Sequence, residues 1–493
     1  MQQFENIIAG KRVGAASGKW IPSLDPFRNE DWCQIPDSDE ADVDRAVQAA
    51  KAAFASAEWG GLTATARGAL LRKFGDLVGV HAQRLAELEV RDNGKLMTEM
   101  LLQLRYIPQW FYYYAGLADK IEGGVLPIDK ADHLVYTTWE PLGVVAAITA
   151  WNSPLLLLTW KLAPGLAAGN TFVVKPSEFA SASTVAFAEL FDEAGFPPGV
   201  VNVVCGTGPA VGEPLVRHRD VAKIAFTGSD NAGRLINRAA ADDFKHTTLE
   251  LGGKSPNIVF EDADLDAAAA GVASGIFAAG GQTCMAGSRL LLQRSVYEKF
   301  LDKICALATD IKLGDPMDPK TQMGPMANIA HYRKVLNCIA DAEAEGARLA
   351  LGGEAHHAAG EGLFVKPTIF RDVKNESQLA QREIFGPVLA VIPFDDESHA
   401  LELANASNYG LGAGIWTTDI KRIFRLTKKL QAGTVWVNTY RALSFMAPFG
   451  GIKHSGLGRE SGQEMMKAYL QPKTVWINNS DKTPENPFVM RLS

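Results

Sequence analysis

Hydrophobic residues recur at helical spacing between residue 42 and residue 120. Three such runs cover residues 42–54, 65–90 and 98–120, and each predicts an amphipathic helix. Pro108 lies inside the third run, where we expect it to kink or interrupt the helix because proline cannot donate the backbone hydrogen bond. The first quarter of the chain is therefore predicted to be largely helical.

Beyond residue 141 the pattern changes to short apolar runs that alternate with helical stretches. The predicted strands cover residues 143–148, 171–175, 200–204 and 223–226, and the predicted helices cover residues 155–168, 180–193, 212–217 and 231–241. Strands that alternate with helices imply parallel pairing through right-handed crossovers. Uninterrupted apolar strands indicate a sheet that is covered on both faces. The pattern predicts a doubly wound, Rossmann-like α/β domain.

The second half of the chain repeats this alternation and predicts a second α/β domain. Its predicted helices cover residues 265–279, 296–311, 329–345 and 397–407, and its predicted strands cover residues 388–392, 412–417 and 434–437. Residues 119–139 and the polar tail after residue 471 fit neither domain. We expect these two segments to form an interface element, since both would otherwise be exposed edges.

Composition and charge narrow the classes of function. The 493 residues are 47% hydrophobic and 21% charged, which is typical of a soluble protein with two or three domains. A net charge of −7 gives no electrostatic reason to bind nucleic acid. The five cysteines are sparse, and the nine histidines lack metal-ligand spacing. With no signal-like or membrane-length apolar segment, we expect a cytoplasmic location, no metal, no nucleic-acid partner and no membrane partner.

One cysteine, Cys284, lies in a predicted turn between a helix and a strand. Residues 280–287 read GGQTCMAG, and Gly280 and Gly281 are expected to end the helix because glycine accepts the left-handed conformation. A thiol in such a turn lies near backbone N–H groups, which suits a nucleophile with an oxyanion site. The alternative is a small buried hydrophobic residue, as most free cysteines are.

Three predicted strand ends carry groups suited to a dinucleotide, because open α/β sheets bind ligands there. Lys175 and Glu178 follow one strand, and a carboxylate in this place accepts from both ribose hydroxyls and repels a 2′-phosphate. Ser229 and the helix after it could donate to a pyrophosphate. Residues 206–212 resemble a glycine-rich phosphate loop with one residue too many. The alternatives are an exposed ion pair, an N-cap serine and a plain strand-to-helix turn.

Two further polar residues stand where they could take part in a reaction. Glu250 lies in an apolar strand that ends at a glycine pair, and burial would raise its pKa into the range of a general base. The alternative is a glutamate at the rim that pairs with Lys254. Asn152 follows the apolar run 143–148, and its amide could donate to an oxyanion. The alternative is a turn-forming asparagine.

The motifs that carry these residues resemble those of the NAD(P)-dependent aldehyde dehydrogenase superfamily, of the hydrolytic type. Seven occur in the family's order over nearly the whole chain: TAWNSP, VVKPSE, FTGS, LELGGKSP, GQTC, EIFGPV and PFGGIKHSGLGRE. The resemblance implies oxidation of a small-molecule aldehyde to a carboxylic acid. Cys284 would form a thiohemiacetal and then a thioester, Asn152 would hold the oxyanion, and Glu250 would activate water. The resemblance also implies that Lys175 is one of the catalytic residues.

The resemblance also implies the residues that hold the cofactor. Lys175 and Glu178 would bind the adenine ribose, Ser229 the pyrophosphate, and Glu383 and Phe385 the nicotinamide ribose and ring. Glu178 favours NAD over NADP. The full set implied for NAD is Ile148, Ala150, Trp151, Lys175, Ser177, Glu178, Gly208, Gly212, Phe226, Gly228, Ser229, Leu251, Glu383 and Phe385.

The domain organisation implied by the resemblance has three parts. Residues 1–120 and 141–252 would form the NAD-binding domain, and residues 253–455 the α/β catalytic domain. Residues 121–140 and 472–493 would form a small β oligomerisation arm, and residues 456–471 would return to the NAD-binding domain. In the family the arm pairs with a neighbouring subunit, which implies a homodimer or a homotetramer.

Ser153 departs from the family's pattern, because many relatives carry an aromatic residue at this position. The substrate tunnel is therefore expected to be roomier or more polar here. The aromatic run 110–114, with Phe445 and Phe449, would line the tunnel and favour an apolar or aromatic aldehyde, unless these residues are core. Arg441 could pair with a substrate carboxylate or be solvated.

Two alternatives to a hydrolytic dehydrogenase remain at this point. One is a CoA-acylating aldehyde or semialdehyde dehydrogenase, against which Glu250 argues because transfer to coenzyme A does not need that base. The other is a non-catalytic relative that keeps the fold as a structural or binding protein. The presence of Cys284, Glu250 and Asn152 together argues against it.

Overall fold

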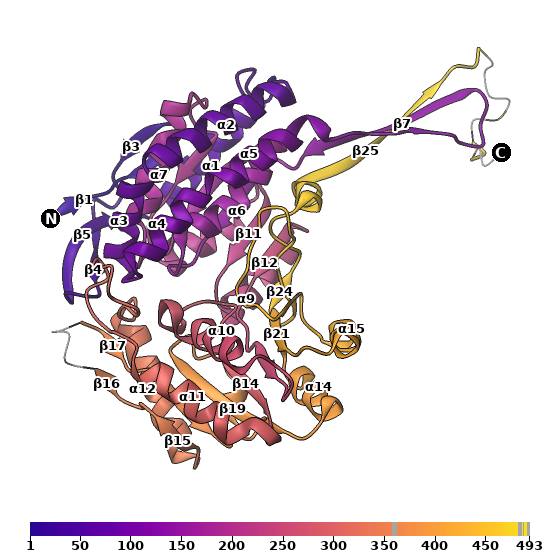
Figure 1. The fold of residues 1–493 in the computed structure, drawn as a ribbon. Helices are drawn as coiled ribbons and strands as arrows, with labels where there is room; N and C mark the ends of the chain where they lie inside the picture. The colour runs from indigo at the N-terminus through magenta and orange to yellow at the C-terminus, as the bar shows by residue number, and fades with distance from the viewer. Residues whose placement is uncertain (357–361, 482–485, 487, 491–493) are drawn as a thin grey trace.

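The computed structural model describes residues 1–493 apart from 357–361, 482–485, 487 and 491–493. Figure 1 shows two α/β bodies stacked one on the other and a long strand arm that projects from the first. The N-terminus lies on the first body, and the last segment of the chain runs out along the arm.

An eight-stranded sheet with the order β24-β12-β11-β8-β9-β10-β2-β3 forms the centre of the first body. The strands β12, β11, β8, β9 and β10 pair in parallel, which confirms the doubly wound prediction. Their bounds are β2 Asn6–Ile8, β3 Lys11–Val13, β8 Val144–Ile148, β9 Thr171–Lys175, β10 Val201–Val203, β11 Val221–Thr227, β12 His246–Glu250 and β24 Gly456–Leu457.

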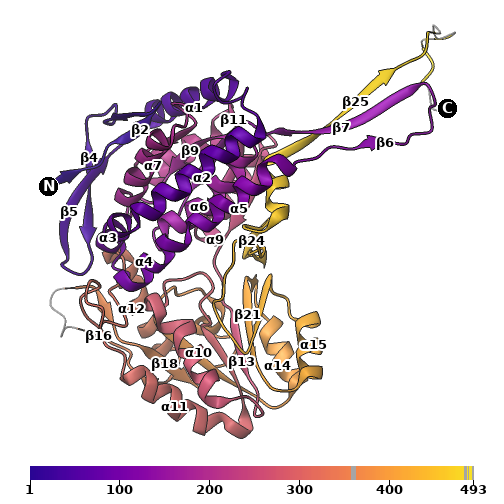
Figure 2. The ribbon, with the colours of Figure 1, turned by 45° about the horizontal axis from the view of Figure 1, so that its top comes forward.

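Helices cover both faces of this sheet (Figure 2). Alternate residues of β8 serve the two faces: Val145 and Ala147 pack into one apolar cluster, and Val144 and Ala146 into the other. The first cluster is covered by α2 Ala64–Val80, α3 Ala82–Asn93, α4 Met97–Tyr106, α5 Pro108–Leu117, α6 Pro154–Ala167 and α7 Ala182–Ala194. The second is covered by α1 Glu40–Ala55, α8 Glu213–Arg217 and α9 Asp230–Ala241.

The second body is built on a seven-stranded sheet with the order β15-β18-β19-β14-β13-β21-β22. Only the edge strand β15 pairs in the antiparallel sense. Its strands are β13 Pro256–Val259, β14 Arg289–Gln293, β15 Arg348–Leu351, β18 Thr368–Arg371, β19 Val388–Phe394, β21 Gly412–Trp416 and β22 Thr434–Val437. Its helices are α10 Leu265–Phe277, α11 Tyr297–Thr309, α12 Ile329–Ala344, α13 Gln378–Gln381, α14 Glu397–Asn405 and α15 Ile420–Lys429.

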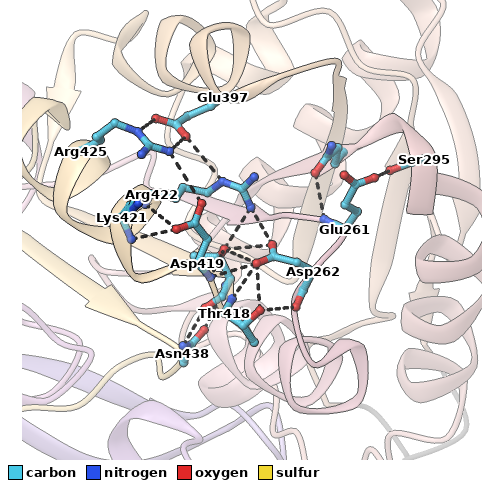
Figure 3. Close-up of polar contacts among 12 residues, drawn as sticks. Glu261, Asp262, Ser295, Glu397, Thr418, Asp419, Lys421, Arg422, Arg425 and Asn438 are labelled. Atoms are coloured by element: carbon cyan, nitrogen blue, oxygen red, sulfur yellow. Dashed lines mark hydrogen bonds and ion pairs between the residues drawn. The ribbon is translucent and has the colours of Figure 1, made fainter.

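A hydrogen-bonded cluster fixes α15 to the end of β13 (Figure 3). The Asp262 carboxylate, three residues after β13, accepts from the Thr417 hydroxyl, the Asp419 N–H and the Arg422 guanidinium. Asp419 caps α15 by accepting from two backbone N–H groups. Glu397 of α14 accepts two hydrogen bonds from Arg425 at 2.7 and 2.6 Å. The cluster joins α14 and α15 to the segment that follows β13 at the surface of the second body.

Several elements differ from the expectation. The run 65–90, which was predicted as one helix, is two helices that meet at His81. The break was not predicted, because α2 and α3 both bury apolar residues and the helical spacing continues across it. Pro108 begins α5, as the predicted interruption requires. A π-helical turn, Gly208–Gly212, precedes α8. The strands β13, β15 and β18 and the helix α15 were not predicted, since they are short or strongly charged.

The N-terminal strands were also not predicted. A three-stranded sheet with the order β1-β5-β4 lies at the side of the first body. It consists of β1 Gln2–Gln3, β4 Trp20–Asp25 and β5 Glu30–Pro36. Two small sheets of two strands each lie elsewhere. One pairs β16 Ala355–His356 with β17 Phe364–Val365, and the other pairs β20 Tyr409–Gly410 with β23 Ile452–Lys453.

The arm is a three-stranded antiparallel sheet of β6 Val125–Leu126, β7 His133–Pro141 and β25 Leu470–Asn478. β7 and β25 pair along their whole length, from Pro141 opposite Leu470 to His133 opposite Asn478. Figures 1 and 2 show that the arm extends well away from both bodies. β6 lies within the expected arm segment 121–140, whereas β7 extends one residue beyond it to Pro141 and β25 begins at Leu470, two residues before the expected start at 472. Residues 482–485, 487 and 491–493 of the expected arm are outside the described part of the chain.

Candidate active site

Three residues singled out in the sequence line one cavity of about 180 Å³ between the two bodies. Cys284, Glu250 and Asn152 share this cavity with Leu251, Glu383 and Phe385. Glu250 is the last residue of β12 in the first body, and Cys284 follows α10 in the second. The fold thus brings the predicted nucleophile, base and amide together from separate segments.

A left-handed turn places Cys284 in this cavity. The helix α10 ends at Phe277, and Ala279, Gly280 and Gly281 then all have positive φ angles, of 53°, 60° and 70°. A Cβ on Gly281 would lie 2.1 Å from the Gly386 carbonyl oxygen, so glycine is required there. Gly280 and Gly281 have the left-handed conformation that was expected of residues ending the helical segment. The Cys284 side chain remains partly exposed.

The surroundings of Cys284 keep its thiol protonated at neutral pH. Burial raises the pKa of Cys284 to about 12, and the nearby carboxyl groups of Glu383 and Glu250 act in the same direction. The thiol is the resting form, and the thiolate is the nucleophile. The side chain therefore needs a proton acceptor when it reacts.

The amide of Asn152 lies against the cysteine turn. Asn152 is buried just before α6, and its Nδ2 donates to the carbonyl oxygen of Gln282 at 3.1 Å. This contact fixes the amide two residues from Cys284 along the chain. An amide N–H held in this way is placed to stabilise negative charge on an oxygen that is bonded to the reacting carbon.

Glu250 is a buried carboxyl group without a hydrogen-bond partner among the described residues. It is 4% exposed, and a Cβ on Gly450 would lie 2.4 Å from its Oε1. Burial and the neighbouring Glu460 raise the pKa of Glu250 well above its usual value, against the opposing effect of Lys161 and Arg459. The alternative of a rim pair with Lys254 is wrong, because the buried Lys254 ammonium also lacks a partner in the described structure.

A buried ion pair lies behind Glu250 that the sequence reasoning missed. Lys161 Nζ donates to Glu460 Oε1 and to Thr227 Oγ1, both at 2.7 Å, and neither charged side chain is exposed. Lys161 is the only charged residue of the apolar helix α6, and that isolation is the signal that could have identified it.

A larger cavity of about 790 Å³ adjoins the first at the carboxyl ends of β8, β9 and β11. Lys175 Nζ lies 3.0 Å from Glu178 Oε2, and Lys175 is buried, so the pair is not the exposed one of the alternative interpretation. Ser229 caps α9 by accepting from Ala232 N. The predicted residues that line it are Ile148, Ala150, Trp151, Lys175, Ser177, Glu178, Gly208, Gly212, Phe226, Gly228 and Ser229.

The two cavities also have lining residues that were not predicted. Arg217, Leu235 and Arg238 line the larger one, and His331 and Lys334 line the smaller one. His331 accompanies Phe385, whose carbonyl oxygen lies 2.7 Å from the His331 Nε2. Most of these residues lie on helices, where a polar or apolar side chain carries no signal that distinguishes a cavity wall from an ordinary surface.

Glu383 connects the smaller cavity to the glycine pair after β12. Its Oε1 accepts from the Gly253 N–H at 2.9 Å, and a Cβ on Gly252 would lie 2.1 Å from its Oε2. Burial raises the pKa of Glu383 to about 7. Within the described residues, no group of three or more histidine, cysteine, aspartate or glutamate side chains could hold a metal ion.

Comparison with known proteins adds a consistent finding. The model of the aldehyde dehydrogenase family matches residues 13–475. The chain is 45% identical over its full length, and over the full length of the relative, to (Z)-2-((N-methylformamido)methylene)-5-hydroxybutyrolactone dehydrogenase of Acinetobacter baylyi. It is 42% identical to human retinal dehydrogenase 2 over 94% of this chain and 90% of that one.

Solved structures agree with the sequence comparison. The NAD⁺ complex of an aldehyde dehydrogenase from Bacillus cereus superposes with a TM-score of 0.95 at 44% identity, covering 97% of each chain. The NAD⁺ complex of betaine aldehyde dehydrogenase from Staphylococcus aureus superposes with a TM-score of 0.97 at 38% identity, covering 99% of this chain and 97% of that one.

Proposed function

The chain belongs to the aldehyde dehydrogenase family, and from this premise we propose how its own residues perform the reaction. It is an NAD-dependent dehydrogenase that oxidises an aldehyde to a carboxylic acid. One observation carries the assignment of roles: the Cys284 thiol and the unpartnered buried carboxyl group of Glu250 line the same cavity in the described structure.

The larger cavity fits NAD. Gly208 and Gly212 have no heavy atom within 4 Å of the position a Cβ would take, so their backbones face open space. Glu178 offers a carboxylate for the ribose hydroxyls, and Ser229 precedes α9, whose positive N-terminal end would attract a pyrophosphate. Glu383 and Phe385 stand in the smaller cavity, where the nicotinamide end would lie. When bound, NAD supplies the acceptor for the hydride.

Covalent catalysis begins at Cys284. The sulfur attacks the aldehyde carbon as its proton passes to solvent water at this partly exposed side chain, and the carbonyl oxygen becomes an oxyanion that the Asn152 Nδ2 and the Cys284 backbone N–H stabilise. The loss of one such donor typically lowers the rate about 10²–10³-fold. Lys175 contributes by holding the cofactor through its ion pair with Glu178.

With NAD bound, the former aldehyde carbon would lose its hydride to the coenzyme and leave a thioester on Cys284. Hydrolysis of this thioester is the role of Glu250. Its raised pKa suits a group that takes a proton from water and passes it on near neutral pH. Water adds to the acyl carbon, the carbon–sulfur bond breaks, and the Cys284 thiol is restored with release of the acid. A CoA-acylating enzyme would not require a base in this place, so the buried carboxyl group favours the hydrolytic reaction.

The test is the variant Cys284→Ala with NAD and a panel of aldehydes. We expect no NADH formation, while NAD still binds as measured by quenching of tryptophan fluorescence. Cys338→Ala is the matched control, because Cys338 is also a partly exposed free cysteine. Retained dehydrogenase activity in Cys284→Ala would show that this mechanism is wrong. A wild-type Cys284 that is inert to iodoacetamide, in a protein that oxidises no aldehyde, would favour the non-catalytic alternative.

We also propose that the arm joins copies of this chain into a homodimer or homotetramer. Most of β25 is exposed, and Trp476 and Ile477 on it are 54% and 41% exposed in a single chain. Large apolar groups on a projecting strand are typical of an interface. The molar mass from light scattering should be at least twice that of the chain. Replacing both residues with glutamate should lower it, whereas replacing the exposed Lys473 of β25 should not.

A reducing compartment agrees with five free cysteines, and we propose a cytoplasmic location. No helix in the described part of the chain combines the length and the apolar character needed to cross a bilayer.

A further inference from the structure

Lys95 is a buried lysine close to the reacting cysteine that the mechanism above does not use. It lies between α3 and α4 and is 2% exposed. Its Nζ donates to Ser153 Oγ at 3.0 Å, and the nearest carboxylate oxygen, Glu99 Oε1, is 3.9 Å away. An ammonium group has three donors. In the described structure, only Ser153 is within hydrogen-bond distance of them.

Ser153 places this ammonium beside the site of the oxyanion. It follows Asn152 directly and precedes α6, but its hydroxyl does not cap that helix. The buried carboxyl group of Glu89 caps it instead, because Glu89 Oε1 accepts from Leu155 N at 2.9 Å. The Ser153 hydroxyl is therefore free to hold Lys95. An aromatic side chain at this position could not accept the hydrogen bond and would occupy the space.

The charged groups around Lys95 carry an excess of positive charge. Glu99, Arg441, Glu89 and Cys284 are the groups that act on Lys95. Glu99 already pairs with Arg441 at 3.2 Å. Burial raises the pKa of Glu89 to about 7, so much of it is neutral near that pH. Two cations then face one carboxylate. Burial lowers the pKa of Lys95, and a further carboxylate would favour its charged form.

We propose that Lys95, held by Ser153, determines specificity by binding a carboxylate that the aldehyde carries near its reacting carbon. This inference rests on the proposed function and names its substrate class, a short aldehyde acid. Asn152 and Ser153 are adjacent, so one residue contacts the aldehyde oxygen while the next holds the ammonium for the distal carboxylate. Arg441 and Glu99 already neutralise each other.

A matched pair of aldehydes tests the inference by activity. The substrates are 4-oxobutanoate and pentanal, which have similar length and differ in the carboxylate. We expect the wild type to prefer 4-oxobutanoate about 10–100-fold in kcat/KM, as a hydrogen bond to a charged group allows. In Lys95→Met this ratio should fall to about one. Because both kcat/KM values come from the same variant, a general loss of thiol reactivity lowers both equally and leaves their ratio unchanged.

Two further variants separate Lys95 from its neighbours. Ser153→Phe should reverse the preference in favour of pentanal, because it removes the acceptor that holds the lysine and fills the space. Arg441→Gln should lower the ratio less than Lys95→Met does, because it releases Glu99 from its ion pair but leaves the Lys95 ammonium in place. A loss of the ratio in Arg441→Gln equal to that in Lys95→Met would overturn the assignment to Lys95.

A binding measurement makes the test independent of turnover. Succinate should slow the alkylation of Cys284 by iodoacetamide in the wild type, and pentanoate at the same concentration should not. The protection should vanish in Lys95→Met, or in Ser153→Phe if the first variant does not fold. If the proposed function is wrong, the enzyme should oxidise neither 4-oxobutanoate nor pentanal, while succinate still protects Cys284 from alkylation. Absence of protection, or a wild-type ratio at or below one, would overturn the inference while the dehydrogenase assignment stands.

Discussion

Lys161 Nζ and Glu460 Oε1 lie 2.7 Å apart in a pair of side chains that are both 0% exposed. A buried ion pair is costly to break, because removal of one partner leaves the other charge uncompensated in the interior. The pair also acts on Glu250: Glu460 raises the pKa of Glu250 and Lys161 lowers it. It therefore affects both the stability of the first body and the protonation of the proposed base.

We expect Lys161→Met to lower the free energy of unfolding by about 3–5 kcal/mol. Replacing both partners by methionine should cost less than the single change, because no buried charge is left alone. Urea unfolding followed by tryptophan fluorescence measures both. Lys467→Met is the control, since Lys467 pairs with Glu464 at the surface and such pairs contribute at most about 1 kcal/mol. Equal losses in Lys161→Met and Lys467→Met would contradict the expectation.

Glu250→Gln should separate the two halves of the reaction. The glutamine keeps the shape of the side chain but cannot take a proton, so the thioester should accumulate. Stopped-flow absorbance should show a first turnover of NADH that is close to the wild type, followed by a steady state slowed about 10²–10⁴-fold. Glu464→Gln, a change of an exposed glutamate, should behave as the wild type. An undiminished steady-state rate in Glu250→Gln would exclude its role as base.

The pKa of about 12 at Cys284 predicts how alkylation of the enzyme without NAD depends on pH. Only the thiolate reacts, so the rate with iodoacetamide should rise about tenfold per pH unit from pH 7 to pH 9, without a plateau. Cys284→Ala gives the background from the other cysteines. At pH 8.5 the variant Glu383→Gln should react faster than the wild type, because it lacks the carboxylate that raises the pKa of the thiol. A plateau below pH 8 would show that the thiol is already ionised.

Glu178 should set the preference between the two nicotinamide cofactors. The wild type is expected to have a higher kcat/KM with NAD, since a carboxylate repels the 2′-phosphate of NADP. Glu178→Gln should narrow the NAD/NADP ratio by at least about tenfold, because the like-charge repulsion is removed. Glu213→Gln, which changes another carboxylate of the same cavity, should narrow it less. A wild-type preference for NADP would overturn the prediction.

The sequence was most informative where a residue is unusual for its element. Strands β9 and β22 were predicted at their observed bounds, Thr171–Lys175 and Thr434–Val437, because each is a short apolar run that begins at a threonine and is followed by a change of pattern. Cys284 and Glu250 stand out because each is unusual where it occurs: Cys284 is a thiol between glycines, and Glu250 is a carboxylate in an apolar strand.

Contacts between distant segments were out of reach of local patterns. The pairing of Lys161 with Glu460 spans 299 residues, and the bond between Lys95 and Ser153 joins a turn to a helix start in another part of the chain. The helix α15 was not predicted because half of its ten residues are basic. Its position depends on the Asp262 cluster (Figure 3), which only the folded chain assembles.

The close approach of Gly281 to Gly386 has a consequence for how this enzyme can diversify. The loop of the nucleophile and the loop that presents Glu383 and Phe385 touch through backbone with no side chain between them, so neither can shift without the other. The residues that would recognise the aldehyde, Lys95 and Ser153, come from other segments. Natural variation can therefore alter which aldehyde is accepted while the geometry between sulfur and coenzyme is inherited unchanged.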